Sequence, residues 1–115
     1  MIFRKPDIEL FQSIAESEIK IRKPVVLQVR KTVRLDSDYC VGLYEDHDEY
    51  HLIKVSRAEI WNPIELFATI VHEYAHAWQS ENGEDSLAHN TVGFRNFRQY
   101  FKSKYNINLI GFNHA

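Results

Sequence analysis

The stretch NPIELFATIVHEYAHAWQ (residues 62–79) decides the fold, because it predicts one long helix on which the rest of the chain packs. Asn62, Pro63 and Glu65 form the capping pattern of a helix start. Apolar residues then recur in steps of three and four, which predicts one buried face. They are Ile64, Phe67, Ala68, Val71, Ala75 and Trp78. Gly83 predicts the end of the helix.

The same stretch carries a motif with metal chemistry. His72 and His76 are four residues apart, so on a helix both imidazoles point at one cation, at about 2.0–2.1 Å for zinc. Glu73 is rotated by roughly 100° from His72, so its carboxylate reaches a zinc-activated water rather than the metal. Such a site hydrolyses peptide bonds, with the glutamate as general base.

A catalytic zinc ion usually has three protein ligands, so a third is required. The metzincin spacing is excluded, because Gln79 and Asn82 stand where that class has Gly and His. Three carboxylates follow the helix too closely to fold back onto it: Glu81, Glu84 and Asp85. His89, thirteen residues after His76, leaves the chain enough length to turn back, and it is the predicted third ligand.

Two further helices and a hairpin are predicted around this motif. A helix runs from an Asp7 cap to near Lys20, and the last helix lies within TVGFRNFRQYFKSKY (residues 91–105). Their apolar stripes are Ile8, Leu10, Phe11, Ile14 and Ala15 in the first, and Phe94, Phe97, Phe101 and Tyr105 in the last. We expect the last helix to pack against the motif helix and present His89 to the site.

The predicted strands complete an α+β fold of the zincin type. PVVLQVRK (residues 24–31) alternates with the period of a strand, and YCVGLY (39–44) and YHLIKVS (50–56) flank EDHDE as a hairpin. We therefore expect a small three-stranded, mostly antiparallel sheet packed on the N-terminal helix, the motif helix and the C-terminal helix. By analogy with other zincins, LIKVS (52–56) is expected to pair with an extended substrate.

Length and composition limit the class of protein. With 115 residues, 44% of them hydrophobic, the chain is expected to form one domain over residues 1–115. No apolar run approaches the roughly 20 residues of a membrane span, and no signal peptide is recognisable, so a cytoplasmic protein is predicted. Cys40 is alone, which excludes an internal disulfide and a cysteine zinc ribbon in this chain; we expect it to be a buried side chain.

Charge is unevenly distributed along the sequence. Residues 1–34 hold eight Lys/Arg against four Asp/Glu, residues 35–86 hold two against twelve, and residues 87–115 hold four against none. Such blocks are usually solvated surface, but the basic flanks are also candidates for phosphate contacts. Three remaining histidines are given no metal role: His47 and His51 beside the hairpin turn, and His114 near the end of the chain.

The order of these features resembles the SprT-like zinc metallopeptidases, which include the Spartan proteases that degrade proteins crosslinked to DNA. The resemblance covers roughly residues 38–101, and HEYAHAW with the downstream His89 is its specific part. It implies that one zinc ion is held by His72, His76 and His89 and that Glu73 is the general base. In that family a Phe follows the third His at the fourth position, whereas Phe94 is at the fifth here.

This chain also departs from the family at its end, since many members add a cysteine zinc ribbon after the protease core. We therefore expect a minimal, stand-alone form of the kind a small bacterial, phage or viral genome encodes. Weak DNA binding would then depend on the core's own basic residues. The candidates for nucleic-acid contact are Arg95, Arg98, Lys102 and Lys104, and those for the oxyanion stabiliser are Arg95 and Tyr100.

Two alternatives to the endopeptidase remain open from the sequence. One is a non-catalytic module that keeps zinc for folding, or binds nucleic acid or protein; an intact Glu73 argues against it, because a structural site needs no water-activating carboxylate. The other is a repressor-cleaving regulator protease of a mobile element, whose third ligand would be a glutamate instead of His89.

Overall fold

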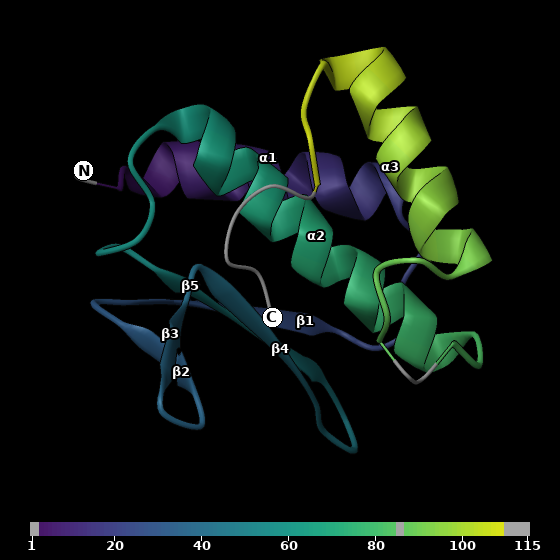
Figure 1. The fold of residues 1–115 in the computed structure, drawn as a ribbon, viewed down its shortest axis with the longest axis horizontal. Helices are drawn as coiled ribbons and strands as arrows, with labels where there is room; N and C mark the ends of the chain where they lie inside the picture. The colour runs from purple at the N-terminus through teal and green to yellow at the C-terminus, as the bar shows by residue number, and fades with distance from the viewer. Residues whose placement is uncertain (1–2, 85–86, 110–115) are drawn as a thin grey trace.

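The computed structural model describes residues 3–84 and 87–109. Its order of elements confirms an α+β fold, with an N-terminal helix, a small sheet region and two C-terminal helices. In chain order they are α1 (Lys5–Glu18), β1 (Val25–Arg30), β2 (Val33–Leu35), β3 (Asp38–Cys40), β4 (Gly42–Asp46), β5 (His51–Ser56), α2 (Pro63–Glu81) and α3 (Val92–Tyr105). The helices lie on one side of the sheet, and α2 contacts both α1 and α3 (Figure 1).

The three-stranded sheet has the order β1-β5-β4. β1 pairs with β5 in parallel, with Val25 opposite His51, and β4 pairs with β5 as the predicted antiparallel hairpin, with Gly42 opposite Val55. A separate antiparallel hairpin joins β2 and β3. Two of the three strand pairings are thus antiparallel, and the main sheet itself is mixed.

The central position of β5 corrects one expectation. We expected LIKVS (residues 52–56) to pair with a substrate, but both edges of this strand are already bonded to β1 and β4. Its side chains explain the position, because all but Lys54 are buried, as in a strand covered on both faces. The strand at the sheet edge beside α2 is β4 instead.

Helix α2 is the centre of the molecule and begins as the sequence predicts. The Asn62 side chain accepts a hydrogen bond from the Glu65 N–H at 2.9 Å, and the Glu65 carboxylate accepts one from the Trp61 N–H at 2.7 Å. The predicted single buried face is too narrow, because every side chain from Leu66 to Ala77 is buried. Ile64, predicted on that face, is 67% exposed because it lies before the helix passes under its neighbours.

Helix α1 starts earlier than predicted. Its N-cap is Arg4, without a side-chain cap, and Asp7 lies in the first turn, where its backbone N–H donates to the Arg4 carbonyl. Ala15 is buried and Phe11 stacks on Phe67 of α2 at 5.0 Å between ring centroids. Leu10, predicted on the stripe, is 54% exposed, so the apolar face of α1 is narrower than its sequence suggested.

Helix α3 buries the side predicted from its aromatic residues. Phe94 and Phe101 are fully buried, and Phe97 and Tyr105 pack against the core. The helix is capped by Thr91, whose side chain accepts from the Phe94 N–H, and it ends before Asn106, which has a left-handed backbone with φ of 56°. This turn sends residues 107–109 back onto α2, where Ile107 and Leu109 are buried.

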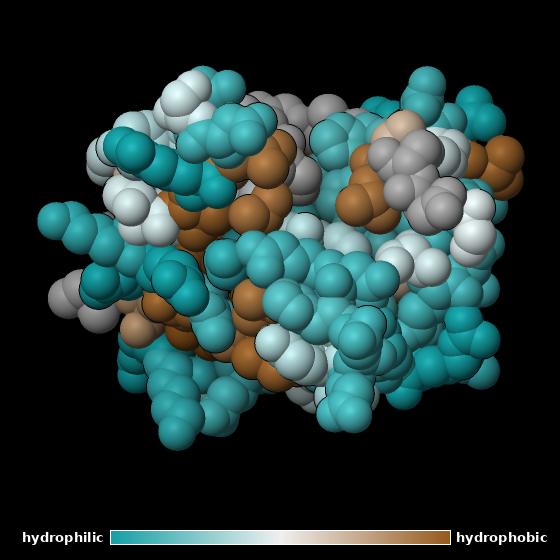
Figure 2. Space-filling view, turned by 90° about the horizontal axis from the view of Figure 1, so that it is seen from below, coloured by the Kyte–Doolittle hydropathy of each residue, from teal (hydrophilic) through white to brown (hydrophobic). Residues whose placement is uncertain are grey.

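The sheet side of the molecule is mostly hydrophilic, with apolar side chains exposed at the left and centre of the view and a smaller group at its upper right (Figure 2). Cys40 is buried, as predicted, and is a free thiol. Burial is also the first cause of its raised pKa, which leaves it protonated and unreactive. No helix in the described part of the chain is both long and apolar enough to cross a bilayer.

Candidate metal centre

Three histidines from two parts of the chain meet in the interior. His72 and His76 lie one turn apart on α2, and His89 lies in the loop before α3. The Nε2 atoms of His72 and His76 are 3.1 Å apart, and those of His76 and His89 are 3.2 Å apart. His72 and His76 are buried, and His89 is partly buried. The structure therefore brings together all three ligands predicted from the sequence.

The ring of His72 is oriented by the segment that follows α3. Its Nδ1 is 2.5 Å from the backbone carbonyl oxygen of Leu109. A carbonyl can only accept a hydrogen bond, so the proton of the neutral ring is on Nδ1 and Nε2 is an acceptor. The turn at Asn106 thus helps to select the tautomer that binds a metal through Nε2.

The ring of His76 is oriented by Gln79, three residues further along α2. Nδ1 of His76 is 2.6 Å from Oε1 of Gln79. The orientation of this amide is determined, because its Nε2 donates to the Ala88 carbonyl oxygen and to Thr91 Oγ1, both at 2.8 Å. Oε1 is therefore the acceptor, His76 carries its proton on Nδ1, and its Nε2 is also an acceptor.

Two acceptor nitrogens thus face each other across 3.1 Å without a proton between the neutral rings. Such a contact is unfavourable unless a cation lies between them, because each lone pair repels the other. Tetrahedral zinc, with Zn–N bonds of about 2.0–2.1 Å, separates its ligand nitrogens by roughly 3.3 Å. The observed spacing fits this arrangement, and all three ligand atoms lie within 4.8 Å of one another.

The loop carrying His89 is attached to α2 by hydrogen bonds on both sides of the histidine. Gln79 holds Ala88 and Thr91, as described above. Glu84 accepts from Thr91 Oγ1 at 2.6 Å and from the Gly93 N–H at 3.1 Å. A Cβ at Gly93 would lie 2.3 Å from the Trp78 ring, so only glycine allows this approach of α3 to α2. These contacts fix the position of the loop and therefore of His89.

Phe94 packs against all three imidazoles. Its ring centroid is 5.0 Å from that of His72, 5.3 Å from that of His76 and 5.1 Å from that of His89. The side chain is fully buried, so it excludes water from one side of the cluster. The one-residue offset of Phe94 from the spacing usual in the family does not remove it from the site, since the loop and the Thr91 cap place it there.

Glu73 lies on the same turn of α2 and is fully buried against the edge strand. A Cβ at Gly42 of β4 would lie 3.0 Å from its Oε2 and 2.7 Å from Cγ2 of Thr69. Burial holds the pKa of Glu73 well above its ordinary range. A bound cation would act in the opposite direction, because positive charge favours the carboxylate.

The electrostatics of the histidines favour the neutral form that binds metal ions. Burial lowers the pKa of His76 to about 4, although its hydrogen bond to Gln79 opposes this and His89 adds to it. Burial also lowers the pKa of His89, helped by the positive charge of Arg98. Neutral imidazoles need not lose a proton before a metal ion binds.

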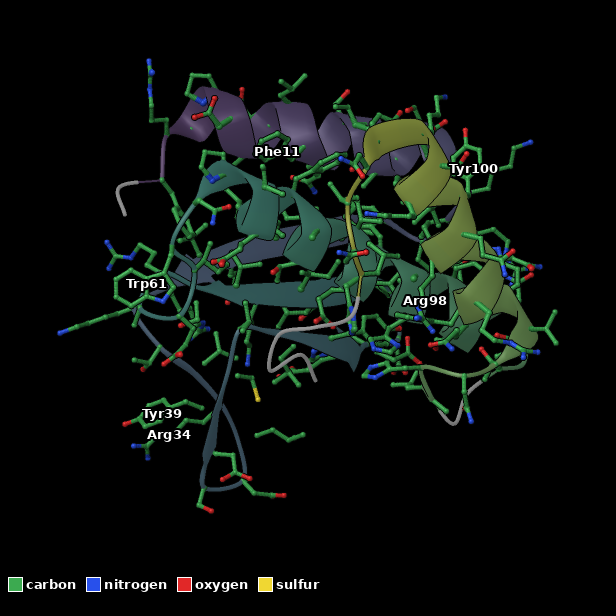
Figure 3. All side chains as sticks on the ribbon, turned by 45° about the horizontal axis from the view of Figure 1, so that its top comes forward. Phe11, Arg34, Tyr39, Trp61, Arg98 and Tyr100 are labelled. Carbon is green, nitrogen blue, oxygen red and sulfur yellow. The ribbon has the colours of Figure 1, made fainter. Side chains whose placement is uncertain are left out.

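The candidates for oxyanion stabilisation and nucleic-acid contact lie on α3, outside the histidine cluster. The Tyr100 hydroxyl donates to Glu18 of α1 at 2.8 Å, and Lys104 forms an ion pair with Glu18 at 2.9 Å. Figure 3 shows Tyr100 beside the end of α1, while Arg98 lies on the side of α3 toward α2. Arg95 and Arg98 share a pocket with Lys102. His114 and Asp85 lie outside the described residues.

The carboxylates and histidines that the sequence analysis rejected as ligands are used elsewhere. His51 is fully buried in β5, where its Nε2 is 2.7 Å from Glu81 and its Nδ1 is 2.7 Å from the Tyr44 hydroxyl. It lies beside the hairpin turn as expected, as the first residue of β5 opposite Asp46, whereas its full burial was not predicted. His47 interacts with Glu45 at 3.1 Å.

Sequence reasoning missed three contributors to the site: Gln79, the Leu109 carbonyl and the supporting role of Phe94. Gln79 had one detectable signal, because it is polar, three residues after a motif histidine, and next to the predicted buried face. The Leu109 carbonyl had none, since any residue can supply a backbone oxygen.

The class defined by this geometry is an α+β protein with a candidate three-histidine metal site on its central helix. No protein-family model matches the sequence, and neither a curated protein nor a solved structure matches the chain. The resemblance to SprT-like metallopeptidases thus depends on the motif and on the order of elements, and the fold adds the converging histidines.

Proposed function

We propose that this protein is a zinc-dependent endopeptidase. The observation that carries the proposal is the contact between the acceptor nitrogens of His72 and His76, with His89 beside them and the carboxylate of Glu73 on the same helical turn. A site made of three neutral imidazoles and a nearby carboxylate is the donor set of hydrolytic zinc centres.

The number of ligands supports a catalytic over a structural centre. Structural zinc sites have four protein ligands, whereas catalytic sites keep one position for water or substrate. The group that the described residues form has three ligand atoms, all from histidine. Imidazole nitrogens also suit copper, iron and nickel, so the choice of zinc depends on the combination with Glu73.

The protein's own residues would then divide the chemistry as follows. A zinc ion held here would supply Lewis acidity and make water acidic enough to attack at neutral pH. Glu73 would take the proton of the attacking water and pass it to the leaving amine. Gln79 and the Leu109 carbonyl hold the two helix histidines in the metal-binding tautomer, and Phe94 keeps water from one side.

The edge strand β4 is the element to which we assign the substrate backbone. Among residues 3–84 and 87–109, β4 pairs with another strand along one side only, and it packs against α2 beside Glu73 through Gly42. An extended peptide added to this edge would gain main-chain hydrogen bonds with little demand on its sequence. Proteins bound to DNA are among the substrates that the resemblance to SprT-like proteins suggests.

Both alternatives receive less support than the endopeptidase. A repressor-cleaving protease of this kind would need a glutamate as third ligand, but the group that the described residues form contains His89 in that place, and the nearby Glu81 and Glu84 bond to His51 and to Thr91. A module that keeps zinc only for folding gives no reason for a buried glutamate next to His72. Such a module would nevertheless bind metal, so metal content alone does not separate it from an enzyme.

The test compares the wild type with Glu73→Gln and with the control Glu9→Gln, which changes an exposed carboxylate of α1. Each protein is loaded with one equivalent of zinc, and its metal content and cleavage of casein are measured. We expect all three to retain zinc, and cleavage to fall by at least about 100-fold in Glu73→Gln alone. Unchanged cleavage in that variant would show that Glu73 is not the general base.

A further inference from the structure

A pocket of about 260 Å³ lies on α3, beside the metal centre. It is lined by Arg95, Arg98, Gln99, Lys102, Asn108 and Leu109. The volume is below the roughly 300–1,000 Å³ of sites that enclose a whole drug-sized ligand, so it suits one side chain rather than a complete small molecule. Each of the five polar side chains in the lining carries hydrogen-bond donors, and three of these side chains are cationic.

Two lining residues connect the pocket to the histidine cluster. Leu109 lines it, and the carbonyl oxygen of the same residue accepts the hydrogen bond from His72. Arg95 also lines it, and it directly follows Phe94, whose ring packs against all three imidazoles. The pocket therefore adjoins residues that contact the candidate metal centre.

The positive charge of the pocket is not neutralised within the described part of the protein. No described carboxylate lies within ion-pair distance of Arg95 or Arg98, and Lys102 contacts only the Asn106 side-chain oxygen at 3.0 Å. Several other cations of the basic segments form ion pairs with carboxylates instead. Lys104 pairs with Glu18, Arg22 with Glu81, and Lys23 with Asp46. The two guanidinium groups of this pocket are therefore available to bind an anion of another molecule.

We propose that this pocket binds an aspartate or glutamate side chain of the substrate, which directs cleavage to peptide bonds near acidic residues. The directing role rests on the proposed endopeptidase function, whereas the binding of an acidic side chain does not. Arg95 and Arg98 would hold the carboxylate, with Gln99 and Asn108 as neutral donors. An acidic peptide fits better than nucleic acid, because affinity for nucleic acid comes from several phosphate contacts along a strand. Here Lys104, one turn beyond the pocket, is already paired with Glu18.

The first experiment maps cleavage sites in a mixture of synthetic peptides of balanced composition. The wild type is compared with the double variant Arg95→Gln/Arg98→Gln and with the control Lys31→Gln/Arg57→Gln, which removes the same charge from exposed positions elsewhere. We expect wild-type and control cuts to be enriched about tenfold within two residues of Asp or Glu, and the double variant to lose this enrichment. The same distribution of cuts in all three proteins would overturn the proposal.

The second experiment measures binding without cleavage, using the Glu73→Gln protein with and without the two arginine substitutions. The probes are a fluorescent alanine-rich peptide with a single Glu, its twin with Gln, and a twelve-residue oligothymidylate. We expect the Glu peptide to bind at least about threefold more tightly than the Gln peptide, with a preference that weakens in salt and disappears in the double variant. Equal binding of the two peptides would overturn the proposal.

These two experiments test the acidic-side-chain pocket and the endopeptidase activity separately. A preference for the Glu peptide in a protein that cleaves nothing would remove the proposed activity and keep the pocket. Cleavage without any preference would keep the activity and remove the pocket. If the oligothymidylate alone depended on Arg95 and Arg98, the pocket would be a nucleic-acid contact and our assignment of an acidic side chain would be wrong.

Discussion

Gln79 links two of the three histidines by hydrogen bonds from a single side chain. Its oxygen accepts from His76, and its nitrogen donates to Ala88 and Thr91 on either side of His89. Groups that orient metal ligands in this way are often worth 10- to 100-fold in metal affinity. The amide is therefore as much a part of the site as the residues that touch the metal.

Replacing Gln79 tests this role. We expect Gln79→Leu, which removes all three hydrogen bonds, to weaken zinc binding by about 10- to 100-fold in competition with a chromophoric chelator. Gln79→Glu keeps the acceptor for His76 and loses only the donor, so its affinity should lie between those of the wild type and Gln79→Leu. Unchanged affinity in Gln79→Leu would mean that His76 is oriented without this side chain.

Gly42 allows β4 to approach the candidate general base. A methyl group there would lie 2.7 Å from Thr69 Cγ2 and 3.0 Å from Glu73 Oε2, and both distances are shorter than van der Waals contact. We expect Gly42→Ala to displace Glu73 and lower cleavage at least about tenfold, while zinc content stays the same, because the histidines are on the adjoining face of the helix.

The control for Gly42 is Gly83, where a side chain has space but the backbone conformation favours glycine. Gly83 has a φ of 79°, but nothing lies within 4 Å of a Cβ placed there. We expect Gly83→Ala to destabilise the protein by about 1 kcal/mol through its backbone and to leave cleavage intact. If both substitutions reduced cleavage equally, the effect of Gly42→Ala would reflect stability rather than contact with Glu73.

At the scale of elements, the two helices that form the site are capped in different ways. Asn62 caps α2 at its far end and bonds only to Glu65. Thr91 caps α3, and its hydroxyl group also accepts from Gln79 and donates to Glu84. One cap therefore serves stability alone, whereas the other joins the start of α3 to the metal centre.

This difference predicts the outcome of two substitutions. Asn62→Ala should lower the free energy of unfolding by about 1 kcal/mol and leave zinc affinity unchanged. Thr91→Val should cost a similar amount of stability, and in addition weaken zinc binding several-fold, since the loop carrying His89 loses two of its hydrogen bonds. Denaturant unfolding without metal and chelator competition measure the two quantities. Equal zinc affinity in both variants would contradict the coupling.

The sequence predicted the elements more reliably than their neighbours in space. The capping pattern at Asn62 and the aromatic spacing of α3 are local signals, and the structure confirms both. The central position of β5 was missed, because alternation along a strand does not say which strands flank it. The burial of His51 was not predicted for a related reason: its partner Glu81 is thirty residues away in the sequence.

In the candidate site, too, the local features were predicted and the contacts between distant residues were not. His72 and His76 follow from helical geometry, and His89 from the length of chain available to it. The Leu109 carbonyl reaches His72 only because the chain reverses after Asn106, and no residue type announces that contact. Gln79 was recognised at first only as a departure from the metzincin pattern, whereas in the structure it orients a ligand.

At the scale of the whole molecule, the buried carboxylate of Glu81 connects the end of α2 to the sheet. Glu81 is 6% exposed and lies 2.7 Å from Nε2 of His51. It also accepts from the backbone N–H groups of Arg22 and Lys23, at 2.7 and 3.0 Å. Burial alone would raise the pKa of Glu81, but these donors outweigh it and lower the pKa to about 2.

The lowered pKa of Glu81 predicts how stability depends on pH. Because the pKa of Glu81 is lower in the folded than in the unfolded chain, its contribution is complete above about pH 4.5 and is lost as the pH falls toward about 2. We expect Glu81→Gln to reduce the free energy of unfolding by about 2 kcal/mol at pH 7 and by little at pH 2. Urea unfolding in EDTA measures it, with Glu9→Gln as the exposed control. A loss independent of pH would contradict the ionic role.

The central claim for the molecule is that one metal ion is held by His72, His76 and His89 together. The most direct measurement is the zinc content per chain, by mass spectrometry of the metal after dialysis, for the wild type, His89→Ala and the control His47→Ala. We predict one zinc per chain in the wild type and in His47→Ala, and a content near zero in His89→Ala. Stoichiometric zinc in His89→Ala, or none in the wild type, would contradict it.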